Sequence, residues 1–275
     1  MAAPSAVSVP AAGTLGREAR AVYAIWLREL TRFVTEPARI VGALGQPVIY
    51  LVIMGTGFGA TFRAAAVPSG FQYLVFMFPG ILGMTVLFTA LFSAISIIWD
   101  REFGFLKEIL VAPVARSSIV LGKVVGGATV ATIQGLILLL LAPFAGVHLG
   151  AVAVVKVCVV LILVASALTS LGLAIASRMA TMEGFQVIMN FLVVPMWLLS
   201  GAFFPLRGLP VWMSVLVRVD PLTYAVDALR GVVYGGSPLA AALVLHPFHV
   251  DLVVVVAVLV AMFALALATF RSRED

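Results

Sequence analysis

Long apolar stretches separated by short polar ones make up most of the chain. Six of these stretches reach the length of about 20 residues with which a helix crosses the hydrocarbon core of a bilayer. They cover residues 40–62, 71–98, 118–145, 151–177, 185–204 and 250–270. A backbone surrounded by lipid has to satisfy its own hydrogen bonds, and these stretches are too long and too uniformly apolar for barrel strands. The pattern therefore predicts an all-α integral membrane protein with six transmembrane helices in one domain, residues 37–275.

Before the first stretch, residues 17–36 show the period of an amphipathic helix, and Pro37 ends it. The apolar side consists of Val22, Tyr23, Trp26, Leu27, Leu30, Phe33 and Val34, and the opposite side of Arg17, Glu18, Arg20, Arg28, Glu29 and Arg32. Arginines facing aromatic residues in this way are typical of a helix that lies in the membrane interface. Residues 1–16 are rich in Ala, Pro and Ser and do not have the pattern of a secretory signal, so we expect a disordered cytosolic tail there.

A charged segment, residues 100–116, interrupts the apolar pattern after the second stretch. At 100° per residue its apolar side carries Phe103, Phe105, Leu106, Ile109 and Leu110, and its charged side carries Asp100, Arg101, Lys107 and Glu108. Glu102 falls on the apolar side. A helix of this length cannot cross a bilayer, but it can lie at the surface with its charges available to a soluble partner.

A second non-spanning region, residues 205–249, contains two apolar pieces, 209–219 and 221–234, that are too short to cross. They are expected to be re-entrant or interfacial helices packed against protein. Asp227 and Arg230 are three residues apart on the second piece and are expected to pair on its surface.

Composition and charge agree with a membrane protein. The chain of 275 residues is 63% hydrophobic and 11% charged, with a mean hydropathy of +1.19. Of the 17 Lys and Arg residues, twelve fall on the side of the N-terminus and five on the other side. The positive-inside rule therefore places both termini in the cytoplasm. The one cysteine, Cys158, excludes an intramolecular disulfide within this sequence.

The chain carries no signature of an energy source of its own. Lys123 follows Gly122, but the glycine and hydroxyl residue of a phosphate-binding loop are missing around them. The ionisable residues nearest to the apolar stretches are His148, Lys156, Glu183 and Asp251, which all fall near stretch ends, whereas ion-coupled carriers place such groups at depth. His246 and His249 without neighbouring ligands indicate a solvated loop rather than a metal site.

Glycines and aromatic residues each leave two interpretations open. The pairs Gly55/Gly59, Gly80/Gly83 and Gly122/Gly126 favour close helix packing within the chain over a dimer seam. Aromatic residues near the outer side favour an interfacial belt over the lining of an exit path; they are Phe71, Tyr73, Phe76, Phe78, Trp197, Phe203, Phe204, Trp212 and Tyr224.

Four stretches carry a resemblance to a known family: Phe78-Pro-Gly-Ile81, residues 101–116, Gly122-Lys123 and residues 220–230. In this order, and with six spans, the chain resembles the permease subunits of the ABC-2 type exporter family, and among them the drug-resistance and nodulation-type lipo-oligosaccharide exporters. The resemblance implies a pore formed by two permeases, a second copy or a similar chain, above two cytosolic ABC ATPase subunits. ATP and Mg²⁺ would bind to those subunits, and this chain would hold no cofactor and no metal.

The resemblance also implies roles for particular residues. Residues 101–112 would be a coupling helix that docks on the ATPase, formed by Arg101, Glu102, Phe103, Phe105, Leu106, Lys107, Glu108, Ile109 and Leu110. Supporting cytoplasmic contacts would come from Arg28, Arg32, Arg178 and Glu183. The re-entrant region would close the outer end of the path, with Phe204, Pro205, Trp212, Asp220, Pro221, Tyr224, Asp227 and Arg230.

Together these observations predict a permease subunit of an ATP-driven exporter in a bacterial inner membrane. Its cargo would be an amphipathic, drug-like or lipid-linked molecule, and a glycolipid or oligosaccharide is the alternative within the same family. A secondary, ion-coupled transporter is the alternative from another class. A membrane-embedded enzyme would need a constellation of carboxylates or histidines that the sequence does not display.

Overall fold

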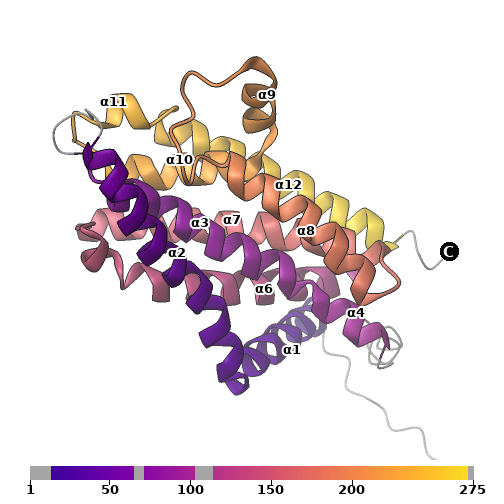
Figure 1. The fold of residues 1–275 in the computed structure, drawn as a ribbon. Coiled ribbons are helices and arrows are strands. Elements are labelled where there is room, and N and C mark those ends of the chain that lie inside the picture. The colour runs from indigo at the N-terminus through magenta and orange to yellow at the C-terminus, as the bar shows by residue number, and fades with distance from the viewer. Residues whose placement is uncertain (1–13, 65–70, 103–113, 272–275) are drawn as a thin grey trace, which may run out of the picture.

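The computed structural model describes residues 14–64, 71–102 and 114–271, and all regular structure in these ranges is helical (Figure 1). The all-α class is therefore confirmed for the described residues. The helices are α1 (Thr14–Thr35), α2 (Pro37–Ala64), α3 (Tyr73–Ser93), α4 (Ile95–Glu102), α6 (Arg116–Leu139), the short 3₁₀ helix η1 (Ala142–Ala145), α7 (Ala151–Arg178), α8 (Met182–Leu199), α9 (Val211–Val219), α10 (Pro221–Val233), α11 (Ala240–Leu243) and α12 (Phe248–Arg271).

Five stretches of helix in the described residues are long and apolar enough to cross a membrane. They are Tyr73–Glu102, Arg116–Leu139, Ala151–Arg178, Met182–Leu199 and Ala240–Phe270. The first expected span, residues 40–62, lies within α2, whose apolar part, Leu44–Gly59, is shorter than a full crossing. The described residues thus support five spans by length and composition, one fewer than the sequence predicts.

Two of the expected spans are not single continuous helices in the structure. The second is divided into α3 and α4 at Ala94, whose amide donates to the carbonyl of Leu91 at 3.3 Å, a tightened turn that changes the course of the chain. The third ends at Leu139 instead of residue 145, and η1 follows it.

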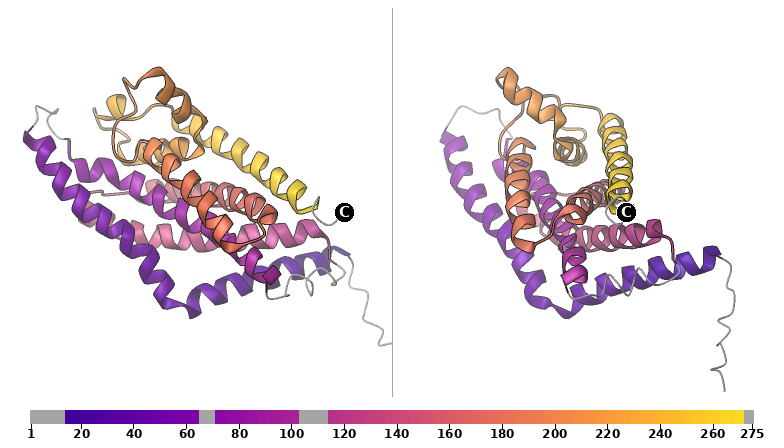
Figure 2. Two further views of the ribbon diagram at one scale, coloured as in Figure 1. Left: turned by 45° about the vertical axis from the view of Figure 1, so that its right-hand side comes forward. Right: turned by 90° about the vertical axis from the view of Figure 1, so that its right-hand side faces the viewer.

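The centre of the bundle is α3, most of whose residues are buried. α6 and α7 pack against it, α12 lies along α7, and α10 fills the space beside α3, α7 and α12 (Figure 2). Gly83 allows α10 to approach α3, because a Cβ atom there would lie 2.9 Å from a methyl group of Val226 on α10. Phe76 and Phe78, expected in an interfacial belt, are buried in this core together with Tyr73 and Trp197, so the belt interpretation is wrong for these four.

The N-terminal helix begins earlier than expected, and its expected apolar side is partly buried and partly exposed. α1 includes Thr14 to Gly16, which were assigned to the tail, and the chain turns sharply between α1 and α2 (Figures 1 and 2). Ile25 and Phe33 are buried, whereas Tyr23, Leu27 and Val34 of the expected apolar side are exposed. α1 packs on α6, where Gly122 and Gly126 leave room for it.

The two short helices α9 and α10 lie close to their expected positions, at the end of the bundle away from α4 (Figure 1). The sequence Asp220-Pro-Leu-Thr223 explains where α10 begins. Asp220 is the N-cap and accepts from the amide of Leu222 at 2.9 Å, and Pro221 occupies the first turn, where a missing amide hydrogen costs nothing. α10 is largely buried, whereas α9 is mostly exposed.

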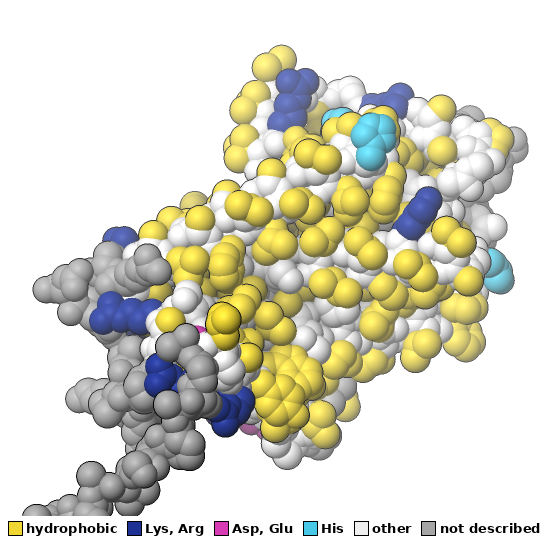
Figure 3. Space-filling view, turned by 180° about the vertical axis from the view of Figure 1, so that it is seen from behind, with side chains coloured by type: hydrophobic (Ala, Val, Ile, Leu, Met, Phe, Trp, Pro, Cys, Tyr) yellow, Lys and Arg dark blue, Asp and Glu magenta, His cyan; other side chains and the backbone are white. Residues whose placement is uncertain are grey.

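The surface agrees with a membrane setting. Figure 3 shows a broad band of hydrophobic side chains across the middle of one face, with Lys and Arg side chains gathered mainly toward its ends. The arrangement is that of a bundle whose sides face lipid.

Candidate functional site at the base of the charged segment

The charged segment, residues 100–116, lies between α4 and α6, and the structure describes both of its ends. Arg101 and Glu102 close α4, and Arg116 opens α6. Residues 103–113 lie outside the described residues, and with them the predicted positions Phe103, Phe105, Leu106, Lys107, Glu108, Ile109 and Leu110. The site is therefore built from the two flanks of the segment and from the helices that hold them.

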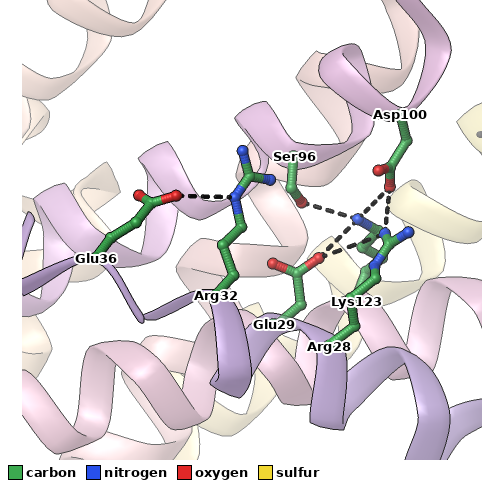
Figure 4. A network of polar contacts seen from close by, with 7 residues as sticks. All are labelled: Arg28, Glu29, Arg32, Glu36, Ser96, Asp100 and Lys123. Carbon is green, nitrogen blue, oxygen red and sulfur yellow. Dashed lines mark hydrogen bonds and ion pairs between the residues drawn. The ribbon is translucent and has the colours of Figure 1, made fainter. Parts of the chain in front are cut away.

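Lys123, in the second turn of α6, is buried with 4% of its surface exposed. Its Nζ atom lies 2.7 Å from Oε1 of Glu29, 2.6 Å from Oδ2 of Asp100 and 2.9 Å from Oγ of Ser96 (Figure 4). An ammonium group has three hydrogens to donate, and here each has an acceptor. A buried charge is tolerated when it is paired and hydrogen-bonded in this way.

Arg28 completes the arrangement from the more exposed side. Its Nη2 atom lies 2.5 Å from Oδ2 of Asp100 and 3.8 Å from Oε1 of Glu29. We call Arg28, Glu29, Ser96, Asp100 and Lys123 the Lys123 cluster. Two cations face two carboxylates, so the cluster is balanced in charge. It joins α1, α4 and α6 at one point.

Further contacts continue the junction along α1. The guanidinium of Arg32 lies 4.1 Å from the centre of the Trp99 ring, and its Nε atom is 3.7 Å from the exposed carboxylate of Glu36. Trp26 donates its indole N–H to Oγ1 of Thr129 on α6 at 3.1 Å. These contacts are more exposed than the Lys123 cluster and are expected to contribute less.

Glu18 binds the other flank of the segment. Its two carboxylate oxygens accept from the amide of Ala115, at 2.9 and 3.1 Å, where α6 begins. Hydrogen bonds from Ser118 and from Ala115 lower the pKa of Glu18 below its usual value. A carboxylate at the start of a helix also interacts favourably with the helix dipole.

Arg101 ties the end of α4 to α7. Its guanidinium donates to the carbonyls of Met179 at 2.6 Å and Ser177 at 3.2 Å, two acceptors at the end of α7 that the helix itself leaves free. Arg178 and Glu183, predicted as supporting contacts, lie exposed on either side of the turn that follows. Glu102 is exposed as well.

The junction connects both ends of the charged segment to neighbouring helices. Both flanks of residues 103–113 are linked to α1. The flank before the segment is linked through Asp100 and Lys123, and the flank after it through Glu18. Breaking a buried ion pair is strongly unfavourable, because it leaves a charge without its partner. The flanks of the segment are therefore joined to α1 and α6 by the Lys123 cluster and Glu18, and to the end of α7 by Arg101.

Sequence reasoning found part of this site. It predicts contacts of Arg28, Arg32 and Arg101 with an ATPase subunit, and the structure places these three side chains around the junction. It did not identify Glu29, Asp100 and Lys123 as partners within the chain. A signal was present, since a lysine inside an apolar stretch of a membrane helix requires a carboxylate somewhere nearby.

At the other end of the bundle the expected surface pair of Asp227 and Arg230 is wrong. Both side chains are buried. Asp227 accepts from the amides of Leu245 and His246, and Arg230 donates to the carbonyl of Gly201 at 2.6 Å while lying 4.2 Å over the ring of Phe76. The pair is not on the surface because α10 is enclosed by its neighbours.

The remaining residues assigned to this end differ in exposure. Pro205 and Trp212 are exposed, whereas Phe204, Pro221 and Tyr224 are partly buried. Burial raises the pKa of the Asp220 carboxyl to about 7, although the hydrogen bonds from Leu222 and Thr223 act in the opposite direction.

A groove of about 190 Å³ lies between α2, α3 and α6. Thr89 donates a hydrogen bond to the buried Gln134 beside it. The lining mixes amide, hydroxyl, aromatic and aliphatic groups: Gln46, Pro47, Met84, Thr85, Phe88, Thr89, Phe92 and Gln134. Such a lining suits a molecule that is partly apolar and partly polar.

Comparison with known proteins gives consistent matches over most of the chain. The model of the ABC-2 type transporter family matches residues 20–234. Inner membrane transport permease YadH of Escherichia coli K12 is 30% identical over 220 residues, which cover 76% of this chain and 81% of that protein. Nodulation protein J of Rhizobium leguminosarum bv. viciae is 27% identical over 205 residues, covering 74% and 77%. Putative transport permease ycf38 of Cyanophora paradoxa is 29% identical over 197 residues, covering 70% and 67%.

Proposed function

Because the chain belongs to the ABC-2 type transporter family, we propose that it is the permease subunit of an exporter whose ATPase is a separate protein. The match confirms the resemblance carried by residues 101–116 and 220–230, since both fall within the matched range. The relatives named as transport permeases support a transport role, and one of them is named for the inner membrane.

The observation that carries the mechanism is the Lys123 cluster. We infer that residues 101–112 receive the ATPase and that the cluster passes the movement of this segment to the bundle. This inference is supported by the hydrogen bonds of Lys123, Asp100 and Glu18, which link both flanks of the segment to α1. Arg28, Arg32, Arg178 and Glu183 then border the docking surface.

The proposed topology has six spans and both termini in the cytoplasm. α2 is the additional span, because its 28 residues are long enough to cross even though its apolar part is short. The excess of Lys and Arg on the side of the charged segment supports this orientation. The Lys123 cluster then lies at the cytoplasmic end and α9 and α10 at the outer end, where they close the path.

We propose an amphipathic cargo, drug-like or lipid-linked, that passes outward along the groove beside α3. Phe88 and Phe92 offer apolar surface there, and Gln134 and Thr89 offer hydrogen bonds at the same depth. Replacing Phe88 with Ala or Gln134 with Leu should lower transport without changing ATPase binding. Phe191→Ala, on an exposed part of α8, is the matched control.

One observation favours the ion-coupled alternative. Asp251 is fully buried in the structure instead of reaching the interface, and buried carboxylates are typical of ion-coupled carriers. Dissipating the proton gradient while ATP is supplied separates the two functions. An ATP-driven exporter keeps its transport rate, and a proton-coupled carrier loses it.

The decisive experiment is reconstitution with an ABC ATPase subunit, for which the neighbouring reading frames are the first place to look. Proteoliposomes containing both subunits should show ATP-dependent transport and ATPase activity stimulated by the permease. The double variant Glu102→Lys/Glu108→Lys should lose both activities while inserting normally into the membrane. Glu36→Lys, an exposed charge reversal on the same side of the protein, is the control. Undiminished transport in the double variant would exclude the segment as the coupling element.

A further inference from the structure

Three side chains from separate elements converge at the end of the bundle opposite the Lys123 cluster. They are Asp227 of α10, His246 from the loop before α12, and Asp251 in the first turn of α12. One ligand atom from each lies within 4.8 Å of the other two. His246 Nδ1 is 3.4 Å from Oδ2 of Asp227 and 3.3 Å from Oδ1 of Asp251.

The group is not satisfied by the protein around it. Asp251 is 0% exposed, and neither of its carboxylate oxygens has a hydrogen-bond partner among the described residues. The Nδ1 atom of His246 is also buried and has no hydrogen-bond partner among the described residues. An ionised carboxylate without a partner is costly to bury, so this site favours a bound cation.

The separations agree with metal coordination better than with hydrogen bonding. At 3.3 and 3.4 Å the contacts of His246 are longer than the usual N–H···O bond of about 2.9–3.0 Å. Two ligands each about 2.05 Å from a tetrahedral ion are about 3.3 Å apart. A single imidazole N–H also cannot serve both carboxylates well, whereas an ion can contact all three ligands.

The surroundings resemble those of a prepared ligand set. Both oxygens of Asp227 accept from the amide of Leu245, at 2.9 and 3.0 Å, and one of them also accepts from the amide of His246 at 2.8 Å, which fixes the carboxylate. The His246 ring stacks on Tyr224 with 5.5 Å between the ring centres. Oriented ligands of this kind raise metal affinity.

Access is available from the outside of the bundle. His246 is partly exposed and lines a cavity of about 190 Å³ with Tyr224, Arg218 and Ser214 among its other walls. The buried Arg230 lies near Asp227 and offsets part of its charge, which leaves the charge of Asp251 for an incoming ion.

We propose that Asp227, His246 and Asp251 bind a divalent transition-metal ion of the Zn²⁺ class. One imidazole and two carboxylates are ligands that such ions accept, whereas Ca²⁺ and Mg²⁺ prefer oxygen ligands alone. The ion joins α10 to α12, with a fourth position open to water. It fixes the short helix that lies beside the core to the last long helix of the chain.

Zn²⁺ binding to the purified, chelator-treated full chain tests the site. Competition with a fluorescent zinc indicator should show one equivalent bound in a Cys158→Ser background. His246→Ala and Asp251→Asn should each weaken binding more than about tenfold. His249→Ala and His148→Ala, which change the other two histidines, should bind as the parent does.

Thermal unfolding gives a second measurement that does not depend on transport. Zn²⁺ should raise the midpoint of the parent chain, because a ligand that binds the folded state stabilises it. It should leave the midpoint of folded His246→Ala and Asp251→Asn unchanged. Equal Zn²⁺ binding by the parent and both variants would overturn the site, and so would an absence of binding by the parent. A preference for Ca²⁺ or Mg²⁺ over Zn²⁺ would overturn the assigned ion class.

Discussion

At the scale of single residues, Lys123 is the most consequential side chain of the Lys123 cluster. Lys123→Met removes the ammonium between Glu29 and Asp100 and leaves two nearly buried carboxylates facing each other. Breaking a buried pair costs about 3–5 kcal/mol, and the lower end applies here because Arg28 still contacts Asp100. We expect a loss of about 3 kcal/mol in unfolding free energy, measured by denaturation in mixed micelles.

Two further variants test whether loss of the ion pairs of Lys123 causes the loss of stability. Glu36→Gln removes only the exposed partner of Arg32 and should cost less than about 1 kcal/mol. Adding Asp100→Asn to Lys123→Met should restore part of the loss, because it removes the excess negative charge and leaves Glu29 with Arg28. A fully additive double variant would show that the two residues do not act as a pair.

Asp220 gives a prediction about pH. Its pKa is raised to about 7 in the folded protein, mainly by burial, so the folded state binds a proton more tightly than the unfolded state. Stability should therefore be highest below the unfolded pKa near 4 and should fall as the pH rises toward 7. Asp220→Asn keeps an effective N-cap for α10 and should remove this part of the pH dependence.

Unfolding midpoints of the parent and Asp220→Asn between pH 5 and 8 test this expectation. The difference between the two curves isolates Asp220 from His246, which also lines the cavity beside Thr223 and is the same in both proteins. Parallel curves would mean that Asp220 is ionised throughout this range.

The limits of sequence reasoning are clearest for these residues. The pair Asp220-Pro221 predicts the start of a helix from local chemistry, and α10 begins there in the structure. Glu29 and Lys123 are 94 positions apart, and no periodicity relates them. Asp227, His246 and Asp251 likewise meet only because α10 and α12 pack together. Long-range pairs depend on the arrangement of helices, which a pattern of apolar residues does not specify.

At the scale of elements, the contact between α1 and α6 depends on a small residue. A Cβ atom at Gly122 would lie 2.9 Å from the Cβ of Ile25 and 3.3 Å from the carbonyl of Val22, both rigid parts of α1. Gly122→Val should therefore push α1 away and weaken the Lys123 cluster without changing any of its members. Loss of permease-stimulated ATPase activity and faster proteolysis of α1 are the expected results.

Gly16→Ala is the matched control for this variant. Gly16 lies in α1, and a Cβ atom there meets nothing within 4 Å. The substitution should stabilise the helix slightly, by up to about 1 kcal/mol, and leave coupling unchanged. If Gly122→Val also leaves coupling unchanged, close packing of α1 on α6 is not required for the junction.

The orientation of α1 shows what an amphipathic pattern leaves open. Helical periodicity distinguishes apolar from charged positions, but in a membrane both lipid and protein accept apolar side chains. Tyr23 and Leu27 are exposed on α1, while Glu29 faces the protein because Lys123 needs it. The amphipathic pattern identified the helix correctly, and the partner charge decided which way it faces.

At the scale of the whole molecule, the two ends of the bundle are held by different chemistry. Ion pairs around Lys123 join α1, α4 and α6 at one end, and α10 is enclosed by α3, α7 and α12 at the other. Composition and hydropathy predicted the helical membrane class and most of the long helices. They did not predict the division of α3 from α4, because one backbone turn at Ala94 leaves no trace in hydropathy.

The ion pairs that join α1 to α6 lead to the last prediction. The contacts of Lys123 with Glu29 and Asp100, at 2.7 and 2.6 Å, are buried, and separating α1 from α6 would break the first of them. We therefore expect α1 and α6 to stay together throughout transport. The variant Ile25→Cys/Gly122→Cys/Cys158→Ser places two thiols at this contact. A Cβ atom at position 122 would lie 2.9 Å from the Cβ of Ile25, shorter than the about 3.5–4.5 Å of a disulfide, so the helices separate slightly in this variant and its reduced form is the reference. The oxidised variant should transport in an ATP-dependent manner as the reduced variant does. If oxidation stops transport and reduction restores it, α1 moves against α6 during the cycle, and the Lys123 cluster is a contact that opens rather than a fixed joint.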